Sequence, residues 1–317
     1  MSTTIGAHAR RFRFGVEMQG PFDATTWAES AREIEALGYS TLFVPDHFHQ
    51  GLGPITAMAT AAAATTTLRV APLVLACDFR HPAVLARELA SIDLLSGGRL
   101  EVGLGAGYNP LDYQRSGLTM DPPGVRVDRL IEHTRVLRQL FANGPVTFAG
   151  RHYRITDLEG TPKPATTGGP PIIIAGGGPR LLRFAAAEAD IIGVNPSTRA
   201  GRDSPATARD ALPDSIDAKF QLLRDAAGER FHSLEFNAWL SLVTFTDTPR
   251  EVAGRLSPRF EATVDEVLDT PLILLGSPDG MAEQLQRRRE RWGYSYVVVP
   301  GPMARAFDGE AARLAGT

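Results

Sequence analysis

The chain has 317 residues, 43% of them hydrophobic and 22% charged, which is enough apolar material for a large core and excludes a disordered or fibrous protein. Its 33 Lys and Arg against 36 Asp and Glu give a net charge of −3, so no bulk positive field attracts nucleic acid or anionic lipid. A single cysteine, Cys77, excludes an internal disulfide. Since the sequence also lacks a signal peptide and an apolar run of membrane-spanning length, we expect a cytoplasmic chain that binds neither nucleic acid nor membrane.

Short apolar segments alternate with longer amphipathic segments, a pattern that predicts parallel strands covered by helices on both faces. Eight segments have the length of strands: 14–16, 41–44, 68–76, 100–104, 171–175, 190–194, 236–244 and 296–299. Expected helices cover 24–37, 82–96, 125–140, 179–187, 215–227 and 279–292, and several of them end at a glycine.

Eight strand and helix units predict the α/β class and a (β/α)8 TIM barrel, with insertions after the fourth, sixth and seventh strands. A doubly wound open sheet is the competing topology, but it rarely uses so many units. We expect one domain over residues 1–317, with residues 1–11 flexible and a loop and helix insertion over 196–234. In a TIM barrel the chemistry lies where the strands end and their following loops begin.

An Asp-His pair follows the second predicted strand. Asp46 and His47 would place a carboxylate and an imidazole at the barrel mouth, where they could orient a ligand and transfer a proton. The alternative is that Asp46 caps the following turn and His47 is an ordinary loop residue. His49 completes a His-x-His pattern, but the fifth and eighth strands end without further ligands, at 175–176 and 299–300, so we expect no metal site.

Two glycine-rich turns follow the fourth and fifth predicted strands. Gly105-Ala106-Gly107 would let a flat ligand approach the backbone, although glycines also occur where strands crowd together. Gly176-Gly177-Gly178 precedes a helix that begins at Pro179, an arrangement that exposes backbone N–H groups to a phosphate. The P-loop lysine and the Rossmann spacing are both absent. The sequence therefore predicts a phosphate site after the fifth strand, where the Asn195 amide is placed to bind the same ligand.

Four motifs in chain order resemble the luciferase-like monooxygenase superfamily, particularly its branch of deazaflavin (coenzyme F420)-dependent oxidoreductases. They are Asp46-His47-Phe48, Phe79-Arg80-His81-Pro82, Gly105-Ala106-Gly107 and Ala175-Gly176-Gly177-Gly178-Pro179. The resemblance implies a TIM barrel, usually a homodimer, whose tricyclic cofactor lies in the barrel mouth.

The resemblance also implies a role for each matching position. Asp46 would bind the deazaflavin head, and His47 would donate or accept a proton near the reacting ring carbon as hydride moves. A bulge with a non-proline cis peptide near Leu73-Val74 would lie behind the ring. The residues expected to bind the rest of the cofactor are Gly105, Ala106 and Gly107, and, around its phosphate, Ala175, Gly176, Gly177, Gly178 and Asn195.

The resemblance implies an oxidoreductase that transfers hydride between F420 and a small organic substrate of the enone, imine or alcohol type, without oxygen insertion. Members of the branch that oxidise sugar phosphates carry a glutamate directly after Gly-x-Gly, where this chain has Tyr108, so we do not expect that reaction. Two alternatives remain: an FMN-dependent monooxygenase of the same superfamily, and a non-catalytic flavin-binding protein.

Overall fold

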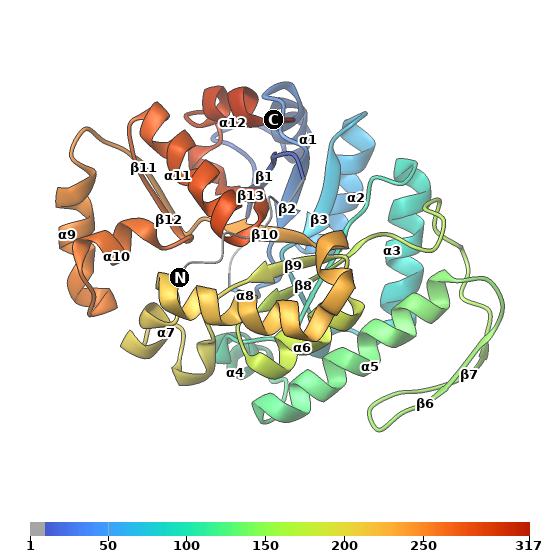
Figure 1. Ribbon diagram of the computed structural model, residues 1–317. Coiled ribbons are helices and arrows are strands. Elements are labelled where there is room, and N and C mark those ends of the chain that lie inside the picture. The colour runs from blue at the N-terminus through green and yellow to red at the C-terminus, as the bar shows by residue number, and fades with distance from the viewer. Residues whose placement is uncertain (1–9, 50) are drawn as a thin grey trace. The chain divides into compact units, whose positions relative to one another are not determined.

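The computed structural model describes residues 10–49 and 51–317 (Figure 1). Most of the segment 1–11, for which the sequence predicts flexibility, lies outside these described residues. The chain forms two compact units. Of the described residues, unit 1 contains 10–16, Leu37–Tyr39 and Ala175–Thr317, and unit 2 contains Glu17–Ala36 and the described part of Ser40–Ile174.

All eight predicted strand positions hold strands, and helices follow them along the chain. This order, with parallel pairing between neighbouring strands, confirms the predicted α/β class and (β/α)8 TIM-barrel fold. The strands are β1 (Arg13–Glu17), β2 (Thr41–Val44), β3 (Arg69–Pro72) with β4 (Leu75–Ala76), β5 (Val102–Gly105), β8 (Ile172–Gly176), β9 (Ile191–Val194), β10 (Glu235–Trp239) and β13 (Tyr294–Pro300).

In unit 2, β2 pairs in parallel with β3, from Thr41 opposite Arg69 onward, and β5 pairs with both β4 and the first residues of β8. Every residue of β2 and β5 is buried, as expected for parallel strands with covered faces. The helices are α1 (Trp27–Ala36), α2 (Pro54–Ala64), α3 (Pro82–Ser96), α4 (Pro110–Ser116) and α5 (Pro123–Phe141), with a short helical turn η1 (Cys77–Phe79). An antiparallel hairpin of β6 (Val146–Ala149) and β7 (Arg154–Leu158) follows α5 (Figure 1).

In unit 1, β10 pairs in parallel with β9 on one side and with β13 on the other. The helices are α6 (Pro179–Glu188), α7 (Pro205–Arg209), α8 (Pro213–Ala227), α9 (Pro249–Phe260), α10 (Val264–Asp269), α11 (Pro278–Trp292) and α12 (Asp308–Leu314), with short helical turns η2 (Thr198–Ala200), η3 (Gly228–Ser233) and η4 (Gly301–Met303). The segment 196–234, predicted as a loop and helix insertion, contains η2, α7, α8 and η3.

The sequence-based expectation of one strand over 236–244 is wrong at its end. The strand β10 stops at Trp239, and a separate strand β11 (Leu242–Phe245) pairs in parallel with β12 (Ile273–Gly276), which the sequence did not predict. The pairing partner changes at this point: Leu240 N–H donates to Val298 O, whereas Ser241 N–H donates to Leu272 O. The elements α9, α10, β11 and β12 are neighbours (Figure 1), and a small cluster of buried apolar residues, which also includes Ala211, lies among them.

The other differences concern the ends of helices, several further helices, and the hairpin of β6 and β7, which the sequence did not predict. The predicted helix over 82–96 matches α3 residue for residue, and the remaining predicted helices agree with the structure within a few residues at each end. The helices that the sequence did not predict are α2, α4, α7, α9, α10 and α12. Among the described residues, no helix is long and apolar enough to cross a membrane.

Candidate active site

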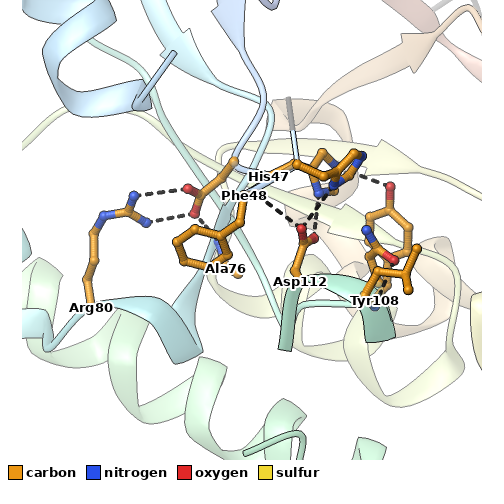
Figure 2. A network of polar contacts seen from close by, with 10 residues as sticks. His47, Phe48, Ala76, Arg80, Tyr108 and Asp112 are labelled. Carbon is orange, nitrogen blue, oxygen red and sulfur yellow. Dashed lines mark hydrogen bonds and ion pairs between the residues drawn. The ribbon is translucent and has the colours of Figure 1, made fainter. Parts of the chain in front are cut away.

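Asp46 lies at the carboxyl end of β2, and a guanidinium binds both of its oxygens. Arg80 donates from Nη1 to Oδ2 at 2.7 Å and from Nη2 to Oδ1 at 2.9 Å, and Ala76 N–H donates to Oδ2 at 3.0 Å (Figure 2). The Asp46 side chain is 6% exposed. Its carboxylate therefore ties the end of β2 to β4 and to the segment that precedes α3, a linkage that the sequence did not predict.

His47 follows directly and has a hydrogen-bonding partner at each ring nitrogen. Its Nδ1 lies 2.7 Å from Oδ2 of Asp112, and its Nε2 lies 3.3 Å from the hydroxyl of Tyr108 (Figure 2). The side chain is 16% exposed, so the imidazole is largely buried but still reachable. An imidazole held at both nitrogens has a fixed orientation, which suits a residue that transfers a proton.

One short segment supplies both partners of His47. Asn109 caps α4, with its side-chain oxygen accepting from Leu111 N–H, and Pro110 occupies the first helical position, a strong start signal for a helix. This start places Tyr108 just before the helix and Asp112 in its first turn.

Asp112 accepts hydrogen bonds from three consecutive residues after β2. In addition to His47 at Oδ2, Phe48 N–H and His49 Nδ1 each lie 3.1 Å from Oδ1. Burial alone would raise the pKa of Asp112, but the hydrogen bonds from His47, Phe48 and His49 outweigh it and lower the pKa below its ordinary value. Asp112 is therefore a carboxylate at neutral pH.

A metal site would need further ligands beside the His-x-His pair, and the structure brings one such residue, Asp112, next to it. Ligand-type atoms of His47, His49 and Asp112 lie within 4.8 Å of one another. Tetrahedral zinc with bonds of about 2.0 Å keeps its ligand atoms roughly 3.3 Å apart. The separation of 2.7 Å between His47 Nδ1 and Asp112 Oδ2 is shorter than that and is a normal hydrogen-bond length. The geometry is that of a hydrogen-bonded network.

The predicted bulge near Leu73-Val74 is present, between β3 and β4, and the peptide bond that joins these residues is cis. Glycines on the neighbouring strand make room for it. A Cβ atom at Gly103 would lie 2.1 Å from Pro72 O, and one at Gly105 would lie 2.7 Å from Val74 Cγ2. Glycine at positions 103 and 105 therefore has a packing reason, because only glycine lets β5 approach the bulge this closely.

The turn after β5 is fixed by two buried side chains. Arg126 donates to the carbonyl oxygens of Ala106 and Gly107. Gly107 has a φ of +70°, and a Cβ atom there would lie 1.9 Å from the hydroxyl of Tyr113. Both the backbone conformation and the lack of space therefore require glycine at position 107. Because packing already explains this glycine, its predicted contact with the cofactor stays a proposal.

The turn after β8 belongs to unit 1 and contains the predicted phosphate-binding residues. Asn195 N–H donates to Gly176 O at 3.1 Å, so the ends of β8 and β9 lie together. A Cβ atom at Gly177 would lie 2.1 Å from Asn195 O, whereas one at Gly178 would meet nothing within 4 Å. Gly178 is the N-cap of α6 and provides no side-chain cap, so the first N–H groups of the helix are open to an anion.

A family model described as luciferase-like monooxygenase matches residues 8–296. The chain belongs to the luciferase-like monooxygenase family. It is therefore an oxidoreductase enzyme, and the resemblance inferred from the four motifs is confirmed.

Individual proteins are similar to this chain in sequence or in fold. The F420-dependent glucose-6-phosphate dehydrogenase of Intrasporangium calvum is 28% identical over 305 residues, covering 86% of this chain and 89% of that protein. The structure of the coenzyme F420-dependent tetrahydromethanopterin reductase of Methanopyrus kandleri has a TM-score of 0.74 and 16% identity, and the match covers 95% of this chain and 98% of that one. A long-chain alkane monooxygenase has a TM-score of 0.73 and 15% identity, with 96% and 91% covered. The two structures share the fold of this chain.

Sequence reasoning placed His47 correctly at a strand end but missed its partner Asp112. The only signal was the Asn-Pro helix start at Asn109, which puts a carboxylate in the first helical turn. Arg80 was part of a family motif, but its pairing with Asp46 was not predicted.

Proposed function

We propose that this protein is an F420-dependent oxidoreductase that transfers hydride between the deazaflavin and a small organic substrate. The observation that carries the proposal is His47, which is held at Nδ1 by a buried carboxylate and has Nε2 directed toward a partly exposed hydroxyl. The strand end that precedes His47 pairs with the strand that runs into the cis-peptide bulge, since Leu73 N–H donates to Val44 O, and the family resemblance places such a bulge behind the cofactor ring. The named F420-dependent relative supports the choice of cofactor.

The residues present fit the cofactor in two places. The open space at Gly178 and the uncapped N-terminus of α6 suit a phosphate, with Ala175, Gly176 and Asn195 in the same turn. In unit 2, the Leu73-Val74 bulge packs against Gly105, and this bulge with the turn Gly105, Ala106 and Gly107 would border the flat ring. The bound deazaflavin would supply a two-electron hydride carrier.

The protein's own contribution is proton transfer and positioning. Reduction of a carbonyl, imine or enone requires one proton for each hydride delivered, and His47 Nε2 would supply it from the imidazolium form, which leaves the neutral imidazole with its hydrogen on Nδ1. In the reverse direction, the same atom would accept the proton of an alcohol. Asp46, with both oxygens held by Arg80, would keep the loop that carries His47 in place and would border the deazaflavin head.

We propose that sugar phosphates are not substrates, although the Intrasporangium calvum relative is named for glucose 6-phosphate. Tyr108 directly follows Gly105-Ala106-Gly107, and its hydroxyl lies 3.3 Å from His47 Nε2. A phenol there lacks the carboxylate charge of the glutamate, which suits an uncharged enone, imine or alcohol group, and these are the substrate classes we propose.

Binding titrations of the purified protein with F420 and with FMN, each oxidised and reduced, test the proposal through absorbance and tryptophan fluorescence. Micromolar binding of F420 with little binding of FMN is the expected result. A preference for FMN would favour the second candidate, an FMN-dependent monooxygenase, for which the alkane monooxygenase fold match is the motivating observation. Binding of F420 without turnover of any enone, imine or alcohol would favour a non-catalytic flavin-binding protein.

A homodimer and a cytoplasmic location are part of this proposal and stay predictions. Sedimentation velocity on the purified protein is the measurement that decides the oligomeric state.

A further inference from the structure

The hydrogen bonds around Asp112 assign it a function beyond that of stabilising a loop. We propose that Asp112 is the positioning residue that holds His47 in the tautomer with hydrogen on Nδ1, so that Nε2 faces the reacting groups. The inference deepens the proposed function, since it rests on His47 being the proton-transfer residue.

The argument begins with the chemistry of the acceptor. An ionised carboxylate only accepts hydrogen bonds, so the nitrogen that lies 2.7 Å from Oδ2 must carry a hydrogen. Because neutral imidazole has one hydrogen, a hydrogen on Nδ1 leaves the lone pair on Nε2. That lone pair faces the hydroxyl of Tyr108 at 3.3 Å, which is then the donor in this pair.

The second step concerns how firmly the carboxylate itself is held. Asp112 is 3% exposed, and its other oxygen accepts from Phe48 N–H and is paired with His49 Nδ1. The backbone donor fixes the carboxylate relative to the loop that carries His47. Rotation of Asp112 away from His47 would break all three interactions at once, so the tautomer of His47 is built into the fold.

The third step compares His47 with His49. Both rings face the same carboxylate, and their centroids are 5.1 Å apart. Only His47 has a second polar partner from the turn after β5, because Tyr108 contacts Nε2 of His47. The side chain of His49 is 25% exposed against 16% for His47. The geometry therefore gives the proton-transfer role to His47 and gives His49 the role of a second donor to Asp112.

Nitrogen NMR of protein labelled with 15N-histidine tests the assignment without cofactor. The ring signals of His47 are identified by their loss in His47→Gln. In the wild type we expect a protonated Nδ1 and an unprotonated Nε2, and in Asp112→Asn we expect this tautomer to lose its dominance. Asp225→Asn, the same substitution at an exposed carboxylate on α8, should leave the His47 signals unchanged.

Kinetics with F420 complete the test. Asp112→Asn should lower kcat by roughly 10- to 100-fold or more while the Kd for F420 stays within about threefold, because wrong-tautomer and supporting-residue substitutions act on rate. A neutral wild-type His47 protonated on Nε2 instead of Nδ1, an unchanged tautomer in Asp112→Asn, or one metal ion retained per chain after dialysis against EDTA would each overturn the assignment. If the tautomer is as expected but F420 does not bind, the proposed function fails and the assignment of Asp112 survives.

Discussion

Arg80 binds both carboxylate oxygens of Asp46, at 2.7 and 2.9 Å, and this pair joins the end of β2 to the segment before α3. The side chains are 23% and 6% exposed, so the pair is mostly withdrawn from water. Removing one partner would leave the other charge poorly solvated. We expect Asp46→Asn and Arg80→Gln each to lower the free energy of unfolding by about 2 kcal/mol, with the double variant losing much less than the sum.

Urea unfolding of the four proteins in this cycle measures the coupling, and a coupling energy below about 0.5 kcal/mol would contradict a buried pair. The same variants separate two roles of Asp46. If Asp46 acts through Arg80, both single variants weaken F420 binding alike. If Asp46 touches the cofactor directly, Asp46→Asn weakens binding far more than Arg80→Gln.

His47→Ala is the variant that tests proton transfer directly. We expect kcat to fall by roughly 10²- to 10⁴-fold, the usual size of a general acid–base contribution, with F420 affinity nearly unchanged. Stopped-flow measurement of deazaflavin oxidation or reduction gives the rate, and a fluorescence titration gives the affinity. An unchanged rate would remove His47 from the mechanism.

Gly178 is the position at which phosphate binding can be tested without disturbing the fold. Its φ is −75°, and an added Cβ meets nothing within 4 Å, so Gly178→Ala should keep F420 affinity within about threefold. Gly178→Asp would cap α6 well but place a negative charge at the proposed phosphate site. We therefore expect Gly178→Asp to fold stably and to bind F420 at least about tenfold more weakly, a loss of about 1.4 kcal/mol.

Gly177 is unsuitable for this test, because a side chain there would collide with Asn195 O regardless of any phosphate. The comparison between Asp and Ala at Gly178 isolates the charge instead. Equal affinities for F420 in these two variants would contradict the phosphate assignment.

Tyr108 is the residue expected to separate this protein from its sugar-phosphate relative. With F420 bound, the wild type should not oxidise glucose 6-phosphate at a measurable rate. Tyr108→Phe should reduce turnover of the accepted substrate by roughly threefold to tenfold, the effect of one hydrogen bond of about 1 kcal/mol, because it removes the hydroxyl next to His47 Nε2. Rapid oxidation of glucose 6-phosphate by the wild type would contradict the proposed substrate class.

The predictable part of the structure was local in sequence. The strand ends that carry His47 and the glycine turns could be located because apolar runs are followed directly by polar or glycine residues. The Leu73-Val74 bulge was predicted only through the family resemblance. Asp112 could not be found because it lies far from His47 in the chain, and only the folded position of α4 brings the two side chains together.

Short apolar runs account for the errors at β10, β11 and β12. The run from Phe236 to Thr244 is continuous in sequence, yet the chain changes its pairing partner at Ser241. The strand Ile273–Gly276 is four residues long, and a run of that length does not distinguish a strand from a piece of helix. In both places the pairing partner, which no local pattern encodes, decides the structure.

His133 on α5 provides the last prediction, which concerns stability rather than chemistry. The side chain is fully buried, and its Nε2 has no hydrogen-bond partner among the described residues. Burial, together with the nearby charges of His81 and Arg80, lowers the pKa of His133 to about 3. The unfolded chain binds this proton near pH 6.5, whereas the folded chain binds it only near pH 3. His133 therefore does not affect the free energy of unfolding above about pH 6.5, and lowers it by about 1.4 kcal/mol per pH unit as the pH falls from there toward 3.

His133→Phe removes the titrating group and keeps an aromatic ring against Tyr153, whose ring centroid lies 5.7 Å away. We expect the loss of unfolding free energy between pH 7 and pH 4.5 to be about 3 kcal/mol smaller in this variant than in the wild type, whatever its stability at pH 7. His232→Phe, at an exposed histidine of η3, is the matched control and should follow the wild-type pH dependence. If His133→Phe lost as much stability as the wild type over this range, His133 would not be held neutral by burial, because only a group that changes protonation on unfolding contributes to the slope.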